Sequence, residues 1–268
     1  MAAFSNAYIL TLKEITDESL NKLKNDLLIL KLKVIIVKGT DGRAMPASNY
    51  YRYFCSTLQR FEYILSPGEI GVALGHAEIL STISDSGDEF SLVLEDDAVI
   101  NDLSKFRDDL DKFIMKRNPE FVHIGCQQLA TRFKLWGEPD LFFKEVFSID
   151  QSSLRYLNGT FGYIIKKSSA KILSQALKEH IFLIDDFVEI SKKLMIKRIF
   201  FFGIIRHPES YADSLIEPER LLKKLKTKKS NVANRIYREI AATMKYRWHL
   251  IRRFTTKISF RSVLIYKE

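Results

Sequence analysis

The sequence lacks the features by which several classes of protein are recognised. No stretch approaches the roughly 18 consecutive apolar residues that a membrane-spanning helix needs. The first ten residues, MAAFSNAYIL, do not join a positively charged start to a long apolar run, so they do not resemble a secretory signal peptide. The chain also contains no internal repeat and no low-complexity segment. We therefore expect a soluble globular protein that works in the cytoplasm.

Cysteine is scarce. The two cysteines, Cys55 and Cys126, lie far apart and show neither C-x-x-C nor Cys/His spacing, which argues against a zinc site. In a cytoplasmic protein the pair is also not expected to form a structural disulfide. With 268 residues, of which 46% are hydrophobic, the chain has enough apolar material for one large core without such cross-links.

Negative charge is scarce towards the carboxyl end. The chain carries a net charge of +9, but residues 219–268 hold 15 Lys or Arg against 3 Asp or Glu, so residues 1–218 are slightly acidic. Within the basic segment, apolar side chains recur every four residues at Val232, Ile236, Ile240, Met244 and Trp248. This spacing predicts a basic amphipathic helix. We expect a folded domain over residues 1–218 and a basic amphipathic helical tail over residues 219–268.

Residues 1–218 alternate strand-like and helix-like segments, which predicts an α/β domain. Ala7–Leu12 is typical of a first strand, Glu18–Lys31 of an amphipathic helix, and Lys33–Lys38 of a second strand that leads into a turn at Gly39–Gly42. Further strands are predicted at EFVHIG, GTFGYIIKK and RIFFFGIIR, and further helices at NDLSKFRDDLDKFIMKR, SSAKILSQAL and FVEISKKL.

The segment LSPGEIGVALGHAEIL predicts a helix with a well-marked start. Ser66 can cap it, Pro67 occupies its first position, and Glu69 completes a capping box with Ser66. Gly71 and Gly75 lie one turn apart and weaken the helix by roughly 1 kcal/mol each relative to alanine. We therefore expect another part of the molecule to pass close to this glycine edge.

The segment LVLEDDAVI, residues 92–100, places three acids at the end of a strand that is otherwise typical of a buried one. Alternation along a strand puts Glu95 and Asp97 on one face and Asp96 on the other. At a strand end, two of these carboxylates can converge on a hard divalent cation such as Mg²⁺ or Mn²⁺. A solvated turn, or the acidic start of a helix, explains the same pattern without a metal.

Together these segments resemble glycosyltransferase family 25, which includes bacterial lipooligosaccharide galactosyltransferases and relatives that glycosylate collagen. The resemblance covers roughly residues 6–216 and also includes the first strand, the KGTDGR turn and the acidic pair in IDDF. It implies a GT-A type nucleotide-sugar-binding sandwich, an α/β fold with a mixed central sheet and helices on both faces. Residues 1–218 are then the glycosyltransferase catalytic domain.

The resemblance also implies roles for individual residues. Asp97 is the expected metal ligand, assisted by Glu95, for Mn²⁺ or Mg²⁺. The residues expected to bind the nucleotide-sugar donor are Thr11, Thr40, Asp41, Gly42, Arg43, Gly75, His76, Glu95 and Asp96. Gly75 stands where the family usually has a serine, which puts a hydroxyl contact there in doubt. The family's arginines after the first strand are missing, so either Lys13 substitutes for them or that contact is absent.

Inverting transfer requires a base that accepts the proton of the attacking hydroxyl group. The resemblance implies that Asp185 or Asp186 supplies it. Either residue can instead be a helix cap for FVEISKKL, worth about 1 kcal/mol without any catalytic role.

The expected function is that of an inverting, metal-dependent glycosyltransferase that moves a hexose, galactose from UDP-galactose, onto a lipooligosaccharide acceptor. Alternatives are UDP-glucose or UDP-N-acetylglucosamine as donor, a protein acceptor, or a catalytically silent protein of the same fold that binds membrane or nucleic acid. For the tail, attachment to an anionic membrane competes with packing against the domain or a second subunit and with nucleic-acid binding. We expect a peripheral protein at the inner face of the cytoplasmic membrane, with a lipid-linked oligosaccharide as partner and no nucleic acid.

Overall fold

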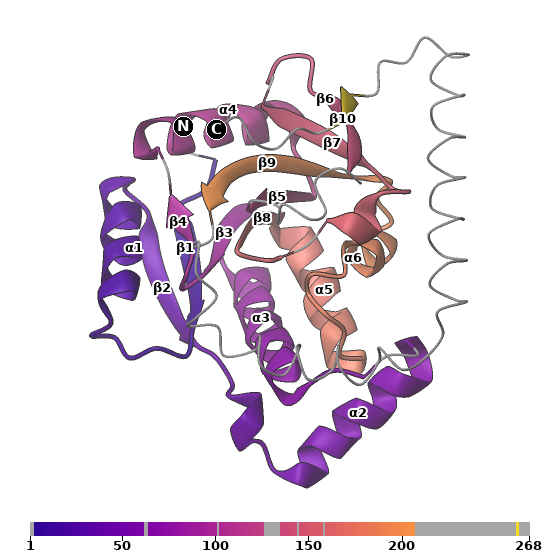
Figure 1. Ribbon diagram of the computed structural model, residues 1–268. Coiled ribbons are helices and arrows are strands. Elements are labelled where there is room, and N and C mark those ends of the chain that lie inside the picture. Colours follow the sequence, from indigo (N-terminus) through magenta and orange to yellow (C-terminus); the bar gives the residue numbers. More distant parts are fainter. Residues whose placement is uncertain are drawn as a thin grey trace.

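Figure 1 shows a computed structural model of the chain, which describes residues 3–61, 64–100, 102–125, 135–143, 145–157, 159–206 and 261–262. Its α-helices are α1 (Glu18–Ile29), α2 (Ala47–Phe61), α3 (Pro67–Asp85), α4 (Leu103–Arg117), α5 (Lys167–Glu179) and α6 (Phe187–Lys193). Its strands are β1 (Asn6–Thr11), β2 (Lys33–Lys38), β3 (Phe90–Glu95), β4 (Val99–Ile100), β5 (Phe121–Gly125), β6 (Trp136–Pro139), β7 (Val146–Asp150), β8 (Gly162–Lys166), β9 (Arg198–Arg206) and β10 (Arg261–Ser262). Two short 3-10 helices are η1 (Gly42–Ala44) and η3 (Leu154–Tyr156).

The strands form one mixed sheet in the order β10-β6-β7-β9-β5-β8-β3-β1-β2, and β4 pairs with β9. Strand β1 lies between β2 and β3 and runs parallel to both. Strand β8 is antiparallel to its neighbours β3 and β5. The carboxyl ends of β1, β2 and β3 therefore meet at one edge of the sheet.

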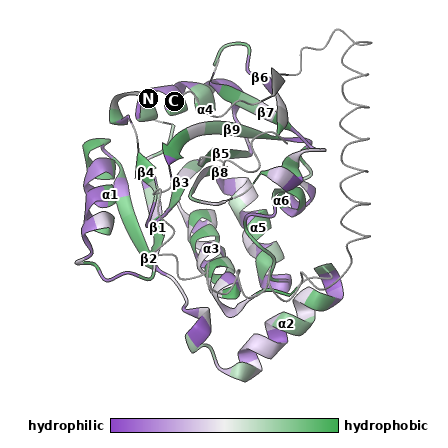
Figure 2. Cartoon of the chain, viewed as in Figure 1, coloured by the Kyte–Doolittle hydropathy of each residue, from purple (hydrophilic) through white to green (hydrophobic). Residues whose placement is uncertain are grey.

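Helices cover both faces of this sheet, because successive side chains of a strand point to opposite sides. In β1, Tyr8 and Leu10 join a core with residues of α3, α5 and α6, whereas Ala7 and Ile9 join a core with residues of α1 and α4. Figure 2 shows that the central strands are largely hydrophobic, while α1 mixes hydrophobic and hydrophilic residues. The predicted mixed α/β sandwich with helices on both faces is confirmed.

The predicted start of α3 is confirmed in detail. The Ser66 side chain accepts a hydrogen bond from the backbone N–H of Glu69 at 3.3 Å, and the Glu69 carboxylate accepts one from the Ser66 N–H at 2.8 Å. Pro67 is the first helical residue. This capping box fixes the end of α3 that lies nearest to the loop after β2.

Helix α2 and the β6–β7 hairpin were not predicted. In α2 only Thr57 is buried, and Tyr50 and Tyr53 pack on a small third core with Ile70 and Ile181. Most of the helix is exposed, although its apolar side chains recur at helical spacing, at Tyr50, Phe54 and Phe61. Within the described part of the chain, no helix is both long and apolar enough to cross a membrane.

The predicted tail, residues 219–268, lies outside the described residues except for β10. The two residues of β10 pair in antiparallel fashion with Trp136 and Gly137 of β6. The boundary at residue 218 and the amphipathic helix of the tail stay predictions.

Candidate active site

A pocket lies beyond the carboxyl ends of β1, β2 and β3, where α/β sheets commonly bind ligands. It is lined by Leu10, Thr11, Leu12, Lys13, Gly39, Thr40, Asp41, Gly42, Arg43, Gly68, Gly71, Val72, Glu95, Asp96 and Asp97. Its volume of about 170 Å³ is below the ~300–1,000 Å³ usual for a whole small-molecule ligand. A nucleotide sugar would therefore extend beyond it. Eight of the twelve predicted site residues line the pocket, whereas Gly75, His76, Asp185 and Asp186 do not.

The three acids of LVLEDDAVI all line this pocket. Strand β3 ends at Glu95, and Asp96 and Asp97 form a turn that is closed by a 3.1 Å hydrogen bond from the Ala98 N–H to the Glu95 carbonyl. The alternation expected for a continuing strand therefore does not apply beyond Glu95. The turn brings all three carboxylates to one side, towards the loops that follow β1 and β2.

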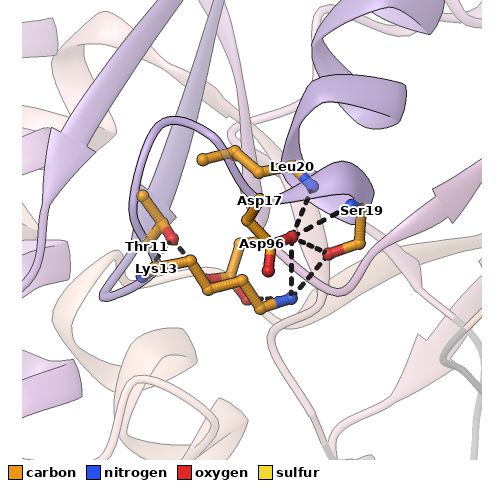
Figure 3. A network of polar contacts seen from close by, with 6 residues as sticks. All are labelled: Thr11, Lys13, Asp17, Ser19, Leu20 and Asp96. Atoms are coloured by element: carbon orange, nitrogen blue, oxygen red, sulfur yellow. Dashed lines mark hydrogen bonds and ion pairs between the residues drawn. The ribbon is translucent and has the colours of Figure 1, made fainter.

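Asp96 is tied to the end of β1 (Figure 3). One of its oxygens, Oδ2, accepts a short hydrogen bond from Thr11 Oγ1, and Lys13 Nζ lies 3.6 Å from Oδ1. Lys13 Nζ also donates to Ser19 Oγ at 2.8 Å, next to Asp17, the N-cap of α1. Burial raises the pKa of Asp96, and the Thr11 hydrogen bond and the Lys13 charge oppose that rise. Lys13 thus provides a cation in the pocket, and its substitution for the family's arginines stays a prediction.

Glu95 is held from the interior of the domain. Its Oε1 accepts a hydrogen bond from Thr160 Oγ1 at 2.5 Å, and His76 Nε2 lies 3.7 Å from the same oxygen. The side chain of Glu95 is 25% exposed, whereas that of His76 is 0% exposed. His76 therefore lies behind Glu95, and its predicted contact with the donor stays a prediction.

The loop after β2 forms the opposite wall. Asp41 caps η1 by accepting from the backbone N–H of Arg43 at 3.0 Å, and the Arg43 guanidinium donates to both Asp41 oxygens at 2.8 and 2.9 Å. These hydrogen bonds from Arg43 lower the pKa of Asp41. The two side chains hold each other in a bidentate ion pair at the pocket wall.

The glycine edge of α3 explains how this loop reaches the helix. A Cβ atom at Gly42 would lie 1.6 Å from the carbonyl oxygen of Pro67, and one at Gly71 would lie 2.3 Å from the carbonyl oxygen of Thr40. Backbone therefore packs directly on backbone at this point. The expected close approach to the helix is confirmed, and the approaching segment is the TDGR loop.

Gly75 serves a different contact. A Cβ atom there would lie 2.5 Å from Cδ1 of Leu10 in β1. The residue is buried and packs α3 against the sheet. A larger residue at this position would require the Leu10 side chain to shift. The predicted donor contact of Gly75 stays a prediction.

Of the acidic pair in IDDF, Asp186 is the N-cap of α6. Its Oδ1 accepts a hydrogen bond from the Glu189 N–H at 3.0 Å. The capping role proposed as the alternative is therefore present for Asp186. Whether Asp185 or Asp186 also acts as a base is not decided by this contact, and that role stays a prediction.

The oxygen atoms that line the pocket suit a hard divalent cation. Among the described residues, no group of three or more His, Cys, Asp or Glu side chains is arranged to hold a metal ion by itself. Mg²⁺, however, is usually bound by one or two carboxylates, with phosphates and water completing its shell. Mn²⁺ prefers similar oxygen ligands. The acidic turn at the pocket wall supplies carboxylates of this kind.

Comparison of sequences finds a distant relative. The chain is 26% identical over 180 residues to procollagen galactosyltransferase 2 of Mus musculus, a match that covers 63% of this chain and 27% of that protein. The chain thus spans about a quarter of the length of this relative.

Solved structures give weaker likenesses. UDP-glucose pyrophosphorylase complexed with UDP-glucose has 14% identity and a TM-score of 0.45, with 76% of this chain and 91% of that chain covered. S. aureus TarS 1-349 has 14% identity and a TM-score of 0.44, with 76% and 60% covered. Likeness at this level does not bear on function.

A family model also matches the chain. Residues 4–188 match the domain of glycosyltransferase family 25 (LPS biosynthesis protein), and they include the pocket, the capped helix α3 and the IDDF acids. A match over more than half of the sequence shows that the chain belongs to glycosyltransferase family 25.

Proposed function

We propose that the chain is an inverting, metal-dependent galactosyltransferase that transfers galactose from UDP-galactose to a lipooligosaccharide. The observation that carries the proposal is the pocket at the carboxyl ends of β1, β2 and β3, in a chain of a family described as LPS biosynthesis proteins. The choice of galactose rests on one distant relative named a galactosyltransferase. UDP-glucose or UDP-N-acetylglucosamine as donor remains the alternative that a donor screen decides.

Within the acidic turn, we assign the metal chiefly to Asp97, as the resemblance to the family's metal-binding motif implies. Glu95 Oε1 accepts a hydrogen bond from Thr160, and Asp96 accepts one from Thr11 and lies 3.6 Å from Lys13 in an ion pair. These contacts make Glu95 and Asp96 well-positioned acceptors for ribose hydroxyls, with Glu95 also available to assist at the metal. When bound, the cation would stabilise the negative charge that develops on the leaving diphosphate. Lys13 adds a second positive charge at the same wall.

The direct test measures UDP release from UDP-galactose in the presence of Mn²⁺ and without acceptor. We expect slow release that stops on addition of EDTA and returns when Mn²⁺ is added in excess. The same assay with UDP-glucose and UDP-N-acetylglucosamine identifies the donor. Absence of release from all three donors, with or without a saccharide acceptor, would favour a silent binding protein of this fold.

We further propose that Asp185 or Asp186 is the base that accepts the proton of the acceptor hydroxyl. For Asp186 the capping and basic roles can be separated by two substitutions. Asp186→Asn keeps a good N-cap but removes the basic carboxylate, whereas Asp186→Ala removes both and should destabilise the protein by about 1 kcal/mol. If Asp186 is the base, both variants lose transfer by about 100-fold or more, and only Asp186→Ala melts earlier. Full transfer by Asp186→Asn would leave Asp185 as the candidate.

We also propose that the basic tail holds the enzyme at an anionic membrane surface, near a lipid-linked acceptor. The tail contains five lysines within seven residues: Lys223, Lys224, Lys226, Lys228 and Lys229. Each basic residue near such a surface contributes about 1 kcal/mol. The alternative is that the tail packs on the domain. One observation supports this alternative, namely the pairing of β10 with β6.

Replacing those five lysines by glutamine in the full chain separates the two possibilities. Membrane attachment predicts that binding to vesicles with anionic lipids weakens by about 100-fold or more, while transfer to a soluble acceptor is unchanged. Neutral phosphatidylcholine vesicles serve as the control. Unchanged binding to the anionic vesicles would contradict the proposal, and a lower melting temperature would point to a structural tail.

A further inference from the structure

A buried chain of polar contacts connects the interior of the domain to the pocket. The Tyr163 hydroxyl lies 3.0 Å from His76 Nδ1, and His76 Nε2 lies 3.7 Å from Glu95 Oε1. Tyr163 and His76 are each 0% exposed. Phe121 stacks on the Tyr163 ring at 5.1 Å with an interplanar angle of 16° and holds it in place. Glu95, in contrast, lines the pocket.

The geometry selects one tautomer of the neutral His76 ring. Burial raises the pKa of Tyr163 beyond its usual range, so the phenol keeps its proton. Within the described part of the chain, His76 Nδ1 is the one hydrogen-bond partner of that hydroxyl. If Nδ1 carried the ring proton, the phenol proton would have no acceptor and the Nε2 lone pair would face a carboxylate oxygen. With Nδ1 as acceptor, the phenol proton is satisfied, and Nε2–H faces Glu95 Oε1 in an electrostatic contact at 3.7 Å, beyond direct hydrogen-bond distance.

We propose that His76, fixed in its Nε2–H form by Tyr163, is a positioning residue that orients the Glu95 carboxylate for the ligand of this pocket. The proposal rests on the proposed function only in taking that ligand to be the UDP portion of the donor. Thr160 acts in the same direction on the same oxygen. One hydrogen bond, from Thr160, and one electrostatic contact, with His76, therefore restrain the Glu95 carboxylate from behind the pocket.

The segment before β8 reinforces this arrangement. The backbone N–H of Glu95 donates to the Phe161 carbonyl at 3.1 Å, one residue after Thr160 and two before Tyr163. Antiparallel pairing sets Val93 opposite Tyr163, and both side chains join the same core. The GTFGY segment thus contacts Glu95 directly through the Phe161 carbonyl and the Thr160 hydroxyl. It also acts on Glu95 indirectly, because Tyr163 contacts His76. A carboxylate restrained in this way loses little conformational entropy when a ligand binds.

The tautomer is tested on the full chain without any ligand. In protein labelled with ¹⁵N-histidine, long-range ¹H–¹⁵N correlations report which ring nitrogen carries the proton, and His76→Gln identifies the His76 signals. We expect Nε2–H in the wild type, an altered Nε2 signal in Glu95→Gln, and mixed tautomers in Tyr163→Phe. A proton on Nδ1 of the wild type, or a His76 spectrum unchanged by Tyr163→Phe, would overturn the proposal. None of these results depends on transferase activity.

The positioning role is tested by UDP binding, measured by calorimetry with Mn²⁺ present. His76→Leu removes the donor and should weaken UDP binding by about 10–100-fold. His76→Gln places an amide N–H near the position of Nε2–H and should restore most of that loss. Equal losses in the two variants would mean that His76 only fills space. If the wild type has His76 in the Nε2–H form but does not bind UDP, the proposed function is wrong, whereas the contact of His76 with Glu95 is still supported.

Discussion

Asp97→Asn is expected to lower transfer by about 100-fold or more while leaving the fold intact. The substitution removes the charge of the carboxylate that we assign to the cation, so the developing charge on the leaving diphosphate loses its main stabilisation. The fold should tolerate the change because asparagine has nearly the same size and shape as aspartate, and the backbone hydrogen bond from Ala98 to Glu95 still closes the turn. The measurement is UDP release as a function of Mn²⁺ concentration, together with the melting temperature.

Glu78→Gln is the matched control. It also removes one negative charge, but Glu78 is exposed on α3 and does not line the pocket. We expect its activity and its Mn²⁺ dependence to equal those of the wild type. Full activity of Asp97→Asn at unchanged Mn²⁺ dependence would remove Asp97 from the site. A matching loss in Glu78→Gln would show that the effect is one of overall charge.

Local signals explain which parts of the fold were predictable. The capping box at Ser66 and Glu69, the continuous apolar run of strand β1 and the leucines of α1 are all specified within a few neighbouring residues. Helix α2 was overlooked although apolar residues recur in it at helical spacing, at Tyr50, Phe54 and Phe61. The carbonyl of Pro46 accepts hydrogen bonds from Asn49 and Tyr50 at the start of α2, so this proline was a second available signal.

The site was predictable where its residues follow parallel strands. The loops after β1, β2 and β3 carry Thr11, Asp41 and Asp96, and they meet because the carboxyl ends of these strands share one edge. The support behind Glu95 was not predictable. Tyr163 lies 87 residues from His76 along the chain, and the two meet only because β8 inserts next to β3 in the sheet. Strand order of this kind is a property of the whole chain and leaves no local pattern.

Gly42→Ala is expected to damage both the pocket and the fold, because the added methyl group has nowhere to go. Its Cβ would lie 1.6 Å from the Pro67 carbonyl oxygen and 3.2 Å from the Gly71 nitrogen. Both are backbone atoms of the capped helix α3, so neither can move away by a change of side-chain rotamer. Gly42 has no positive φ, so alanine suits its backbone and the cost is steric. The loop that carries Asp41 must then move away from α3. A displacement near 1 Å in a binding wall costs about 100-fold in activity.

The overpacking itself should cost about 1–3 kcal/mol of folding free energy, seen as a melting temperature lower by several degrees. Gly87→Ala is the matched control, because a Cβ atom at Gly87 meets nothing within 4 Å. That variant should melt at or slightly above the wild-type temperature and bind UDP normally. If Gly42→Ala bound UDP and melted like Gly87→Ala, the loop and α3 would not be in direct backbone contact in solution. Loss of UDP binding with an unchanged melting temperature would instead mean that the loop yields independently of the helix, so that the pocket wall is set by the loop alone.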